Sequence, residues 1–124
     1  MSKVPDRYRR TTKYVHVLAE LVRAAQYRGA TTYQDIALIM GLPHKGLHMS
    51  REIGWILGEI AEDEVKAGRP MLSAVAVSVK GKPGPGFFDL ARQLGKLAHA
   101  KDEQAFWRSE RDAAYAAWKR PLPK

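Results

Sequence analysis

The stretch Lys-Gly-Lys-Pro-Gly-Pro-Gly at residues 80–86 constrains the fold of this chain more than any other feature. It holds three glycines and two prolines in seven residues, so neither a helix nor a regular central strand can form there. We expect an exposed turn, or wing, that presents Lys80 and Lys82. Helical patterns lie on both sides of it.

Three helices are expected before this stretch. Apolar residues recur there at three- and four-residue steps, over residues 12–28, 33–40 and about 48–67. Thr12 and Thr32 are placed as N-caps of the first two helices, and Gly41 is placed to end the second. The third helix contains Gly54 and Gly58, each of which costs about 1 kcal/mol relative to alanine. Such glycines favour close approach of another backbone or of a ligand.

The same third helix carries a run of acidic residues, which we interpret as a solvated face. The run consists of Glu59, Glu62, Asp63 and Glu64. A metal site would need carboxylates from several elements, and one helical run does not supply them. His44 and His48 lie four residues apart, but they sit in or beside a turn and have no evident third ligand. We therefore expect no metal and no cofactor.

The pattern after Pro70 changes to a valine-rich run of small residues, which predicts a strand over 71–79. Helical spacing returns over 87–97 and again over about 102–119. The last helix bears aromatic residues that we expect to cap a small core, with a base-stacking platform, a partner-binding face or a dimer contact as alternatives. They are Phe106, Trp107, Tyr115 and Trp118.

The order of these elements is typical of a winged helix-turn-helix. We predict a mostly α fold with a small β-hairpin, in one domain spanning residues 1–124. Its expected parts are a basic amino-terminal arm, a winged-helix-like core and a carboxy-terminal helical extension, over residues 1–10, 11–88 and 87–119.

The balance of charge favours a nucleic-acid partner. Lys and Arg number 21 against 13 Asp and Glu, a formal net charge of +8, and such an excess is typical of nucleic-acid-binding domains. The chain has no cysteine, which excludes disulfides, thiolate metal sites and cysteine nucleophiles. No apolar run is long enough to span a bilayer, and no signal-peptide core follows the start. We therefore expect a cytoplasmic protein without a membrane partner.

In a winged helix the third helix enters the major groove of double-stranded DNA and the wing lies along the backbone. On this chain Ser50 and Arg51 would face the groove, after an approach turn that contains Lys45 and His48. The remaining predicted DNA contacts are phosphate contacts from the wing and the arm, made by Lys80, Lys82, Arg9 and Arg10. The arm has an alternative interpretation as an ordinary solvated terminus.

Two segments resemble a known family. Residues 32–43 (TYQDIALIMGLP) and 51–58 (REIGWILG) are similar to the DNA-binding domain of alkylguanine DNA alkyltransferases and alkyltransferase-like proteins. The resemblance covers roughly residues 30–95. It implies that Tyr33 pushes on a backbone phosphate while a nucleotide is flipped out of the duplex. It also implies that Arg51 fills the space that the flipped base leaves.

The chain departs from this family where the catalytic Pro-Cys-His-Arg segment should follow Pro70. It has Met-Leu-Ser-Ala at residues 71–74 instead, and Ser73 lacks the glycine-flanked turn of a hydrolase nucleophile. Alkyl transfer to cysteine is therefore excluded. We expect a non-enzymatic double-stranded DNA-binding protein that recognises a lesion or a DNA structure. The alternative is a small basic protein-interaction module or inhibitor that binds an acidic protein partner.

Overall fold

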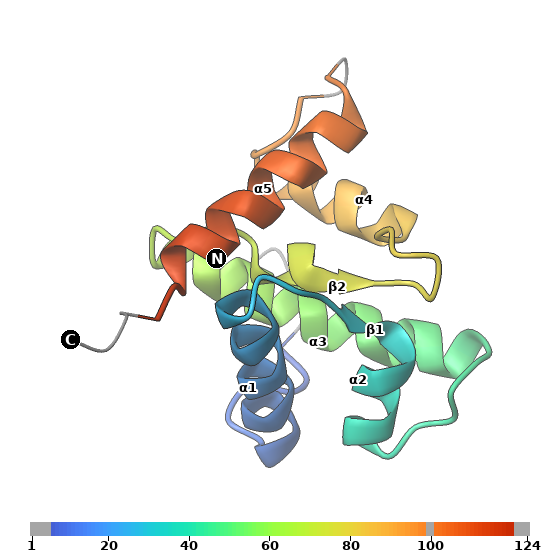
Figure 1. Ribbon diagram of the computed structural model, residues 1–124. Coiled ribbons are helices and arrows are strands. Elements are labelled where there is room, and N and C mark those ends of the chain that lie inside the picture. Colours follow the sequence, from blue (N-terminus) through green and yellow to red (C-terminus); the bar gives the residue numbers. More distant parts are fainter. Residues whose placement is uncertain (1–5, 99–100, 121–124) are drawn as a thin grey trace.

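The computed structural model describes residues 6–98 and 101–120. These residues form a mostly helical fold with a small β element, as expected (Figure 1). In chain order the elements are α1 (Thr12–Gln26), β1 (Thr31–Thr32), α2 (Tyr33–Met40), α3 (Leu47–Lys66), the 3-10 turn η1 (Leu72–Val75), β2 (Ala76–Val77), α4 (Pro85–Gln93) and α5 (Glu103–Ala117).

The two strands correct the prediction of a β-hairpin. β1 and β2 pair in parallel, with Thr31 opposite Ala76 and Thr32 opposite Val77. The expected strand over 71–79 is reduced to these two β2 residues, because the chain before them is wound into η1. A returning strand cannot follow either, since Pro85 begins α4, where its fixed φ suits a first helical turn.

The expected wing is a loop. The N–H of Ser78 donates to the carbonyl of Lys82 at 2.8 Å, and the N–H of Gly81 donates to the carbonyl of Ser78 at 2.8 Å. Gly81 has φ 82°, a conformation that glycine adopts without strain. The turn therefore lies where the glycines and prolines predict it, and it carries Lys80 and Lys82 as exposed side chains.

The cap residues set the start of the first two helices. Thr32 caps α2 as predicted, with its side chain accepting from the N–H of Asp35, and Gly41 ends α2 at φ 73°. α1 begins at Thr12 as expected, but its N-cap is Thr11 and not Thr12, with the Thr11 side chain accepting from the N–H of Tyr14.

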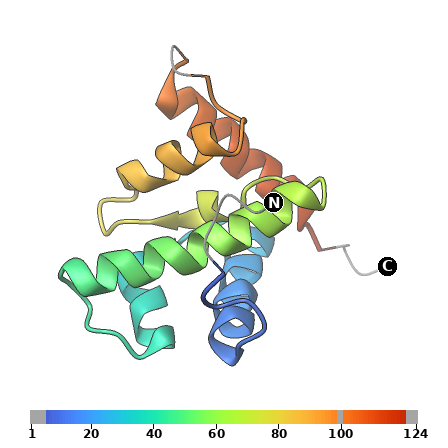
Figure 2. The same cartoon turned by 180° about the vertical axis from the view of Figure 1, so that it is seen from behind.

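α3 runs through the middle of the fold, with α1 and α2 on one side and α4 and α5 on the other (Figure 2). Its apolar stripe packs against the buried faces of α1 and α2. A second cluster joins η1, β2, α4 and α5. The largest buried side chains of the first cluster include Leu21, Ile36, Met40, Ile56 and Ile60. None of the helices in the described ranges is long and apolar enough to cross a membrane.

The three glutamates of the acidic run on α3 are buried, which corrects the expectation of a solvated face, and only Asp63 is partly exposed. Glu59 is fully buried, and its carboxylate accepts the N–H groups of Arg7 at 3.1 Å, Tyr8 at 2.8 Å and Arg9 at 2.9 Å. Glu62 and Glu64 are 3% and 4% exposed. These carboxylates meet partners from other parts of the chain, which a pattern within one helix cannot reveal.

Side chains of the amino-terminal segment strengthen this attachment. The guanidinium of Arg7 stacks 3.7 Å from the ring centroid of Trp55. The hydroxyl of Tyr8 donates to Glu52, and burial together with that bond raises the pKa of Tyr8 to about 12. Residues 6–10 are therefore part of the fold, while residues 1–5 of the expected arm lie outside the described residues.

α5 braces η1 from the side opposite α3. The indole N–H of Trp107 donates to the carbonyl of Ala74 at 2.9 Å, and the carboxylate of Glu110 accepts the N–H of Met71 at 2.8 Å. Lys96 forms an ion pair with Glu110. The aromatic residues of α5 pack against the two core clusters, which confirms that they cap the core.

We predict that Glu59→Ala lowers the free energy of unfolding by about 2–4 kcal/mol, because three backbone N–H groups lose their common acceptor. Urea denaturation measures the loss. Trypsin should then cleave after Arg7 and Arg9 faster than in the wild type. Asp112→Ala, which removes a carboxylate with a 65% exposed side chain, should change stability by less than about 0.5 kcal/mol. Equal losses in the two variants would contradict the anchoring role of Glu59.

Candidate nucleic-acid interface

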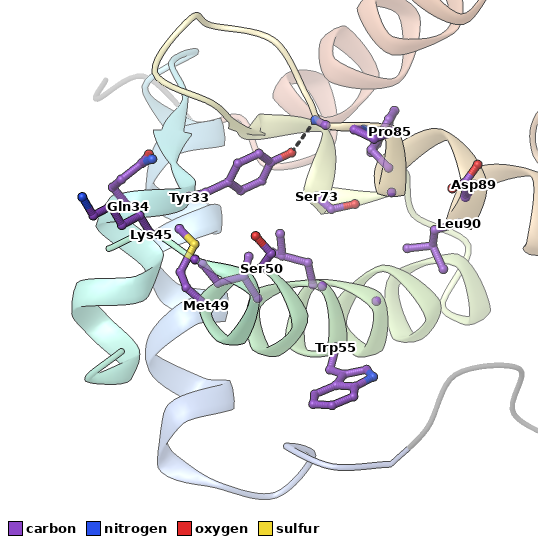
Figure 3. Close-up of a pocket in the computed structure, with 18 of the residues that line it drawn as sticks. Tyr33, Gln34, Lys45, Met49, Ser50, Trp55, Ser73, Pro85, Asp89 and Leu90 are labelled. Atoms are coloured by element: carbon purple, nitrogen blue, oxygen red, sulfur yellow. Dashed lines mark hydrogen bonds between the residues drawn. The ribbon is translucent and has the colours of Figure 1, made fainter. Parts of the chain in front are cut away.

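A cavity of about 740 Å³ lies between α3 and the segment that leads from the loop after β2 into α4 (Figure 3). Its volume falls within the range of about 300–1,000 Å³ typical of ligand sites. α2 and η1 also contribute to its walls. The residues that line the cavity include Tyr33, Lys45, Ser50, Ile53, Gly54, Leu57, Gly58, Ser73, Gly84 and Leu90.

One wall of the cavity is a stripe of α3. Ser50, Gly54 and Gly58 follow one another at four-residue steps, and Leu57 lies three residues after Gly54, so they share a face of the helix. A Cβ atom added to Gly54 would meet no atom within 4 Å. Gly54 therefore borders open space, in agreement with the expectation that it leaves room beside the helix, and Gly58 lines the same cavity.

Tyr33 joins α2 to the opposite wall. Its hydroxyl accepts the N–H of Gly84 at 2.8 Å, shown as a dashed line in Figure 3. Burial raises the pKa of Tyr33, and the bond from Gly84 acts in the opposite direction. The phenol thus stays protonated at neutral pH and keeps its own proton free to donate at the edge of the cavity.

Basic side chains and helix N-termini lie at the edge of the cavity, which Asp89 of α4 also lines. His44, Lys45 and Gly46 line it, and Gly46 begins α3 without any side-chain cap. Gly84 is the N-cap residue of α4 and likewise provides no side-chain cap. Neither α3 nor α4 has an acidic residue in its first turn. Uncapped helix N-termini present N–H groups and a positive partial charge, which attract anions such as phosphate.

Three of the predicted DNA contacts line the cavity, and two more are exposed near the start of α3. Tyr33, Lys45 and Ser50 line the cavity, while His48 and Arg51 are exposed in the first turns of α3. Within residues 6–98 and 101–120, five basic side chains among the predicted DNA contacts form no ion pair. They are Lys45, His48 and Arg51, together with Lys80 and Lys82 of the wing loop.

Arg9 and Arg10, which were also predicted as DNA contacts, form ion pairs with carboxylates of the amino-terminal segment and of α3. The side chain of Arg9 is 14% exposed and pairs with Glu62 at 2.7 Å and Asp63 at 3.1 Å. Arg10 pairs with Asp6 at 3.3 Å. Trp55, on which Arg7 of the amino-terminal segment stacks, is itself among the residues that line the cavity. Arg9 is thus largely buried against its carboxylates, whereas the side chain of Arg10 is 83% exposed.

Sequence reasoning missed several cavity residues, among them Ser73 of η1 and Leu90 of α4. No local pattern marks them, because the cavity forms only when η1 and α4 come to lie beside α3. The structure also bears on the histidine pair at 44 and 48. Across the described residues, no three His, Cys, Asp or Glu side chains come together as metal ligands.

Comparison with protein families, curated proteins and solved structures gives no match for this chain. The resemblance to the alkyltransferases therefore depends on the two segments at residues 32–43 and 51–58. Its functional meaning has to be inferred from the cavity and from the charges around it.

We predict that Tyr33→Phe lowers the free energy of unfolding by about 1 kcal/mol, because the N–H of Gly84 loses its acceptor. Amide hydrogen exchange at Gly84 should become faster, and urea denaturation measures the change in stability. Tyr27→Phe is a matched control, since Tyr27 is 67% exposed. Unchanged exchange at Gly84 in Tyr33→Phe would show that the bond does not hold the loop.

Proposed function

We propose that this protein is a non-enzymatic, double-stranded DNA-binding protein of winged-helix type, with a loop as its wing, that holds an extruded nucleotide in the cavity between α3 and α4. The observation that carries the proposal is this cavity, of about 740 Å³, whose edge is formed by Lys45 and the uncapped start of α3. A cavity lined by apolar and polar side chains, with basic side chains and helix N-termini at its edge, suits a planar base attached to a phosphate chain.

The unpaired cations supply the attraction to DNA. Lys45 and Arg51 lie near the start of α3, and Lys80 and Lys82 lie on the wing loop. Cations that the fold does not neutralise are available for phosphates, and each phosphate contact adds about 0.9 to the slope of binding against salt on logarithmic scales. Arg9 is left out of this set because its side chain is 14% exposed and paired with Glu62.

Extruding a nucleotide costs a few kcal/mol of stacking and pairing. The cavity offers burial for the extruded base, and Arg51, exposed on α3, is free to occupy the space left in the duplex, as the resemblance implies. Tyr33, at the edge of the cavity, is in reach of a phosphate attached to that base. A damaged or mismatched base costs less to extrude, so such a protein favours lesions.

The chemistry of the site supports recognition of DNA without transfer of an alkyl group to the protein. A chain without cysteine cannot accept an alkyl group on a thiolate. The alternative of a protein-binding module or a dimer contact through the aromatic helix lacks a specific observation. Trp107 is 8% exposed, and Phe106, Tyr115 and Trp118 pack against the core clusters.

We predict that Arg51→Ala weakens binding to a duplex with a single mismatch at least about tenfold more than binding to the intact duplex, because only the extruded state uses the arginine. The double substitution of Lys80 and Lys82 by alanine should weaken both equally and lower the salt slope by about 1.8. Fluorescence anisotropy across a salt series measures both effects.

Lys119→Ala, at an exposed position after α5, is the matched control and should leave both affinities unchanged. An absence of duplex binding by the wild type at low salt would refute the proposed function. If Arg51→Ala lost the same affinity for both duplexes, Arg51 would make only an ordinary phosphate contact.

We predict that Gly54→Leu fills the cavity and prevents extrusion while duplex binding persists. A duplex containing 2-aminopurine reports on this, since its fluorescence rises when the base leaves the stack. The rise should be lost in the variant, and the salt slope should be retained. Stability should not fall, because leucine has the better helix propensity by nearly 1 kcal/mol and the added Cβ meets open space.

Ala105→Leu adds the same bulk at an exposed position of α5 and should behave as the wild type. An undiminished fluorescence rise in Gly54→Leu would show that the base does not enter the cavity.

A further inference from the structure

The hydroxyl of Ser73 is an unsatisfied polar group in the buried wall of the cavity. Ser73 is 5% exposed and lines the cavity, and its Oγ has no hydrogen-bond partner among the described residues. Figure 3 shows the side chain extending from η1 into the space over α3. A buried hydroxyl without a partner is unfavourable in the free protein, and such groups are rare enough to need an explanation.

The backbone on both sides of Ser73 is held in place. The N–H of Met71 donates to Glu110, and the carbonyl of Ala74 accepts from the indole of Trp107, both on α5. The N–H of Ala74 also donates to the carbonyl of Met71 at 3.1 Å, which closes η1 around the serine. The hydroxyl therefore has a fixed position at the cavity, as a preorganised binding group requires.

The cavity that Ser73 lines is lined by both apolar and polar side chains, the polar ones including Ser50, Asp89 and Gln93. Ile53 and Leu57 of α3 and Leu90 of α4 line the same cavity, and none of them can hydrogen-bond. The hydroxyl of Tyr33 already accepts from Gly84. A planar guest between these side chains thus gains apolar contact on its faces and can satisfy Ser73 only through a polar atom on its edge.

We infer that the Ser73 hydroxyl forms a hydrogen bond with a ring nitrogen or an exocyclic oxygen of the extruded base, and so selects nitrogen heterocycles over apolar rings of the same shape; this rests on the proposed function. A hydroxyl both donates and accepts, so it suits either kind of edge. A site built to hydrogen-bond its guest rejects an isostere that lacks the bonding group, because the buried partner is then left unpaired.

The test uses two duplexes that differ in one ring. One carries thymine and the other 2,4-difluorotoluene, a ring of the same shape without effective hydrogen-bonding groups, each opposite an abasic site so that neither has a pairing partner. The wild type should bind the thymine duplex roughly 3- to 10-fold more tightly, the range expected for one neutral hydrogen bond. Ser73→Ala should lose this preference, whereas Ser109→Ala, exposed on α5, should keep it.

A second measurement separates a binding role from a structural one. The thermal midpoint of free Ser73→Ala should equal or exceed that of the wild type, because the substitution removes an unpaired buried hydroxyl. A midpoint lowered by several degrees would overturn the inference, since the hydroxyl would then have a partner in the fold.

The outcomes also separate this inference from the function on which it rests. If Ser73→Ala keeps the thymine preference while Gly54→Leu loses it, the cavity still holds the base and the role of Ser73 is refuted. If the wild type binds both duplexes equally well, the selectivity is refuted. If the wild type binds neither duplex, the proposed function and this inference are refuted together.

Discussion

The arrangement around α3 depends on the hydrogen bonds that the buried carboxylate of Glu59 accepts. This carboxylate accepts three consecutive backbone N–H groups and so attaches the amino-terminal segment to one side of the central helix. That segment would otherwise be a free basic terminus. With that side closed by the chain itself, the stripe of α3 that contains Gly54 and Gly58 remains open, and the cavity forms along it. A buried carboxylate is tolerated because its acceptor capacity is used.

α5 has the corresponding role on the opposite side. It contributes nothing to the edge of the cavity, but Trp107 and Glu110 hold η1 at its two ends. η1 in turn presents Ser73 to the cavity, and β2 follows it directly. The helix that has no counterpart in the family resemblance thus determines the position of the buried wall. The packing of α5 against the core clusters also accounts for the aromatic residues of this helix.

The distribution of charge shows which basic side chains the fold pairs with carboxylates, which net charge alone does not reveal. The formal charge of +8 led to two expected phosphate-binding regions, the arm and the wing. In the fold, the arginines of the arm meet carboxylates, whereas Lys45, Arg51 and the wing lysines meet none among the described residues. An arginine that pairs with a buried carboxylate is retained there because separating them would leave that charge uncompensated.

Much of the secondary structure could be predicted from the sequence, because it depends on interactions between residues close together in the chain. The threonine cap of α2, the end of α2 at Gly41, the long third helix and the turn at residues 80–86 all follow from short-range rules of backbone and side chain. The parallel pairing of β1 with β2, the burial of Glu59 and the placement of Ser73 do not, since each joins residues far apart in the sequence. The sequence by itself determined the helices, their ends and the absence of a thiol nucleophile. Only the tertiary structure decided which charges remain free and where the cavity lies, because both depend on partners that the folded chain alone brings together.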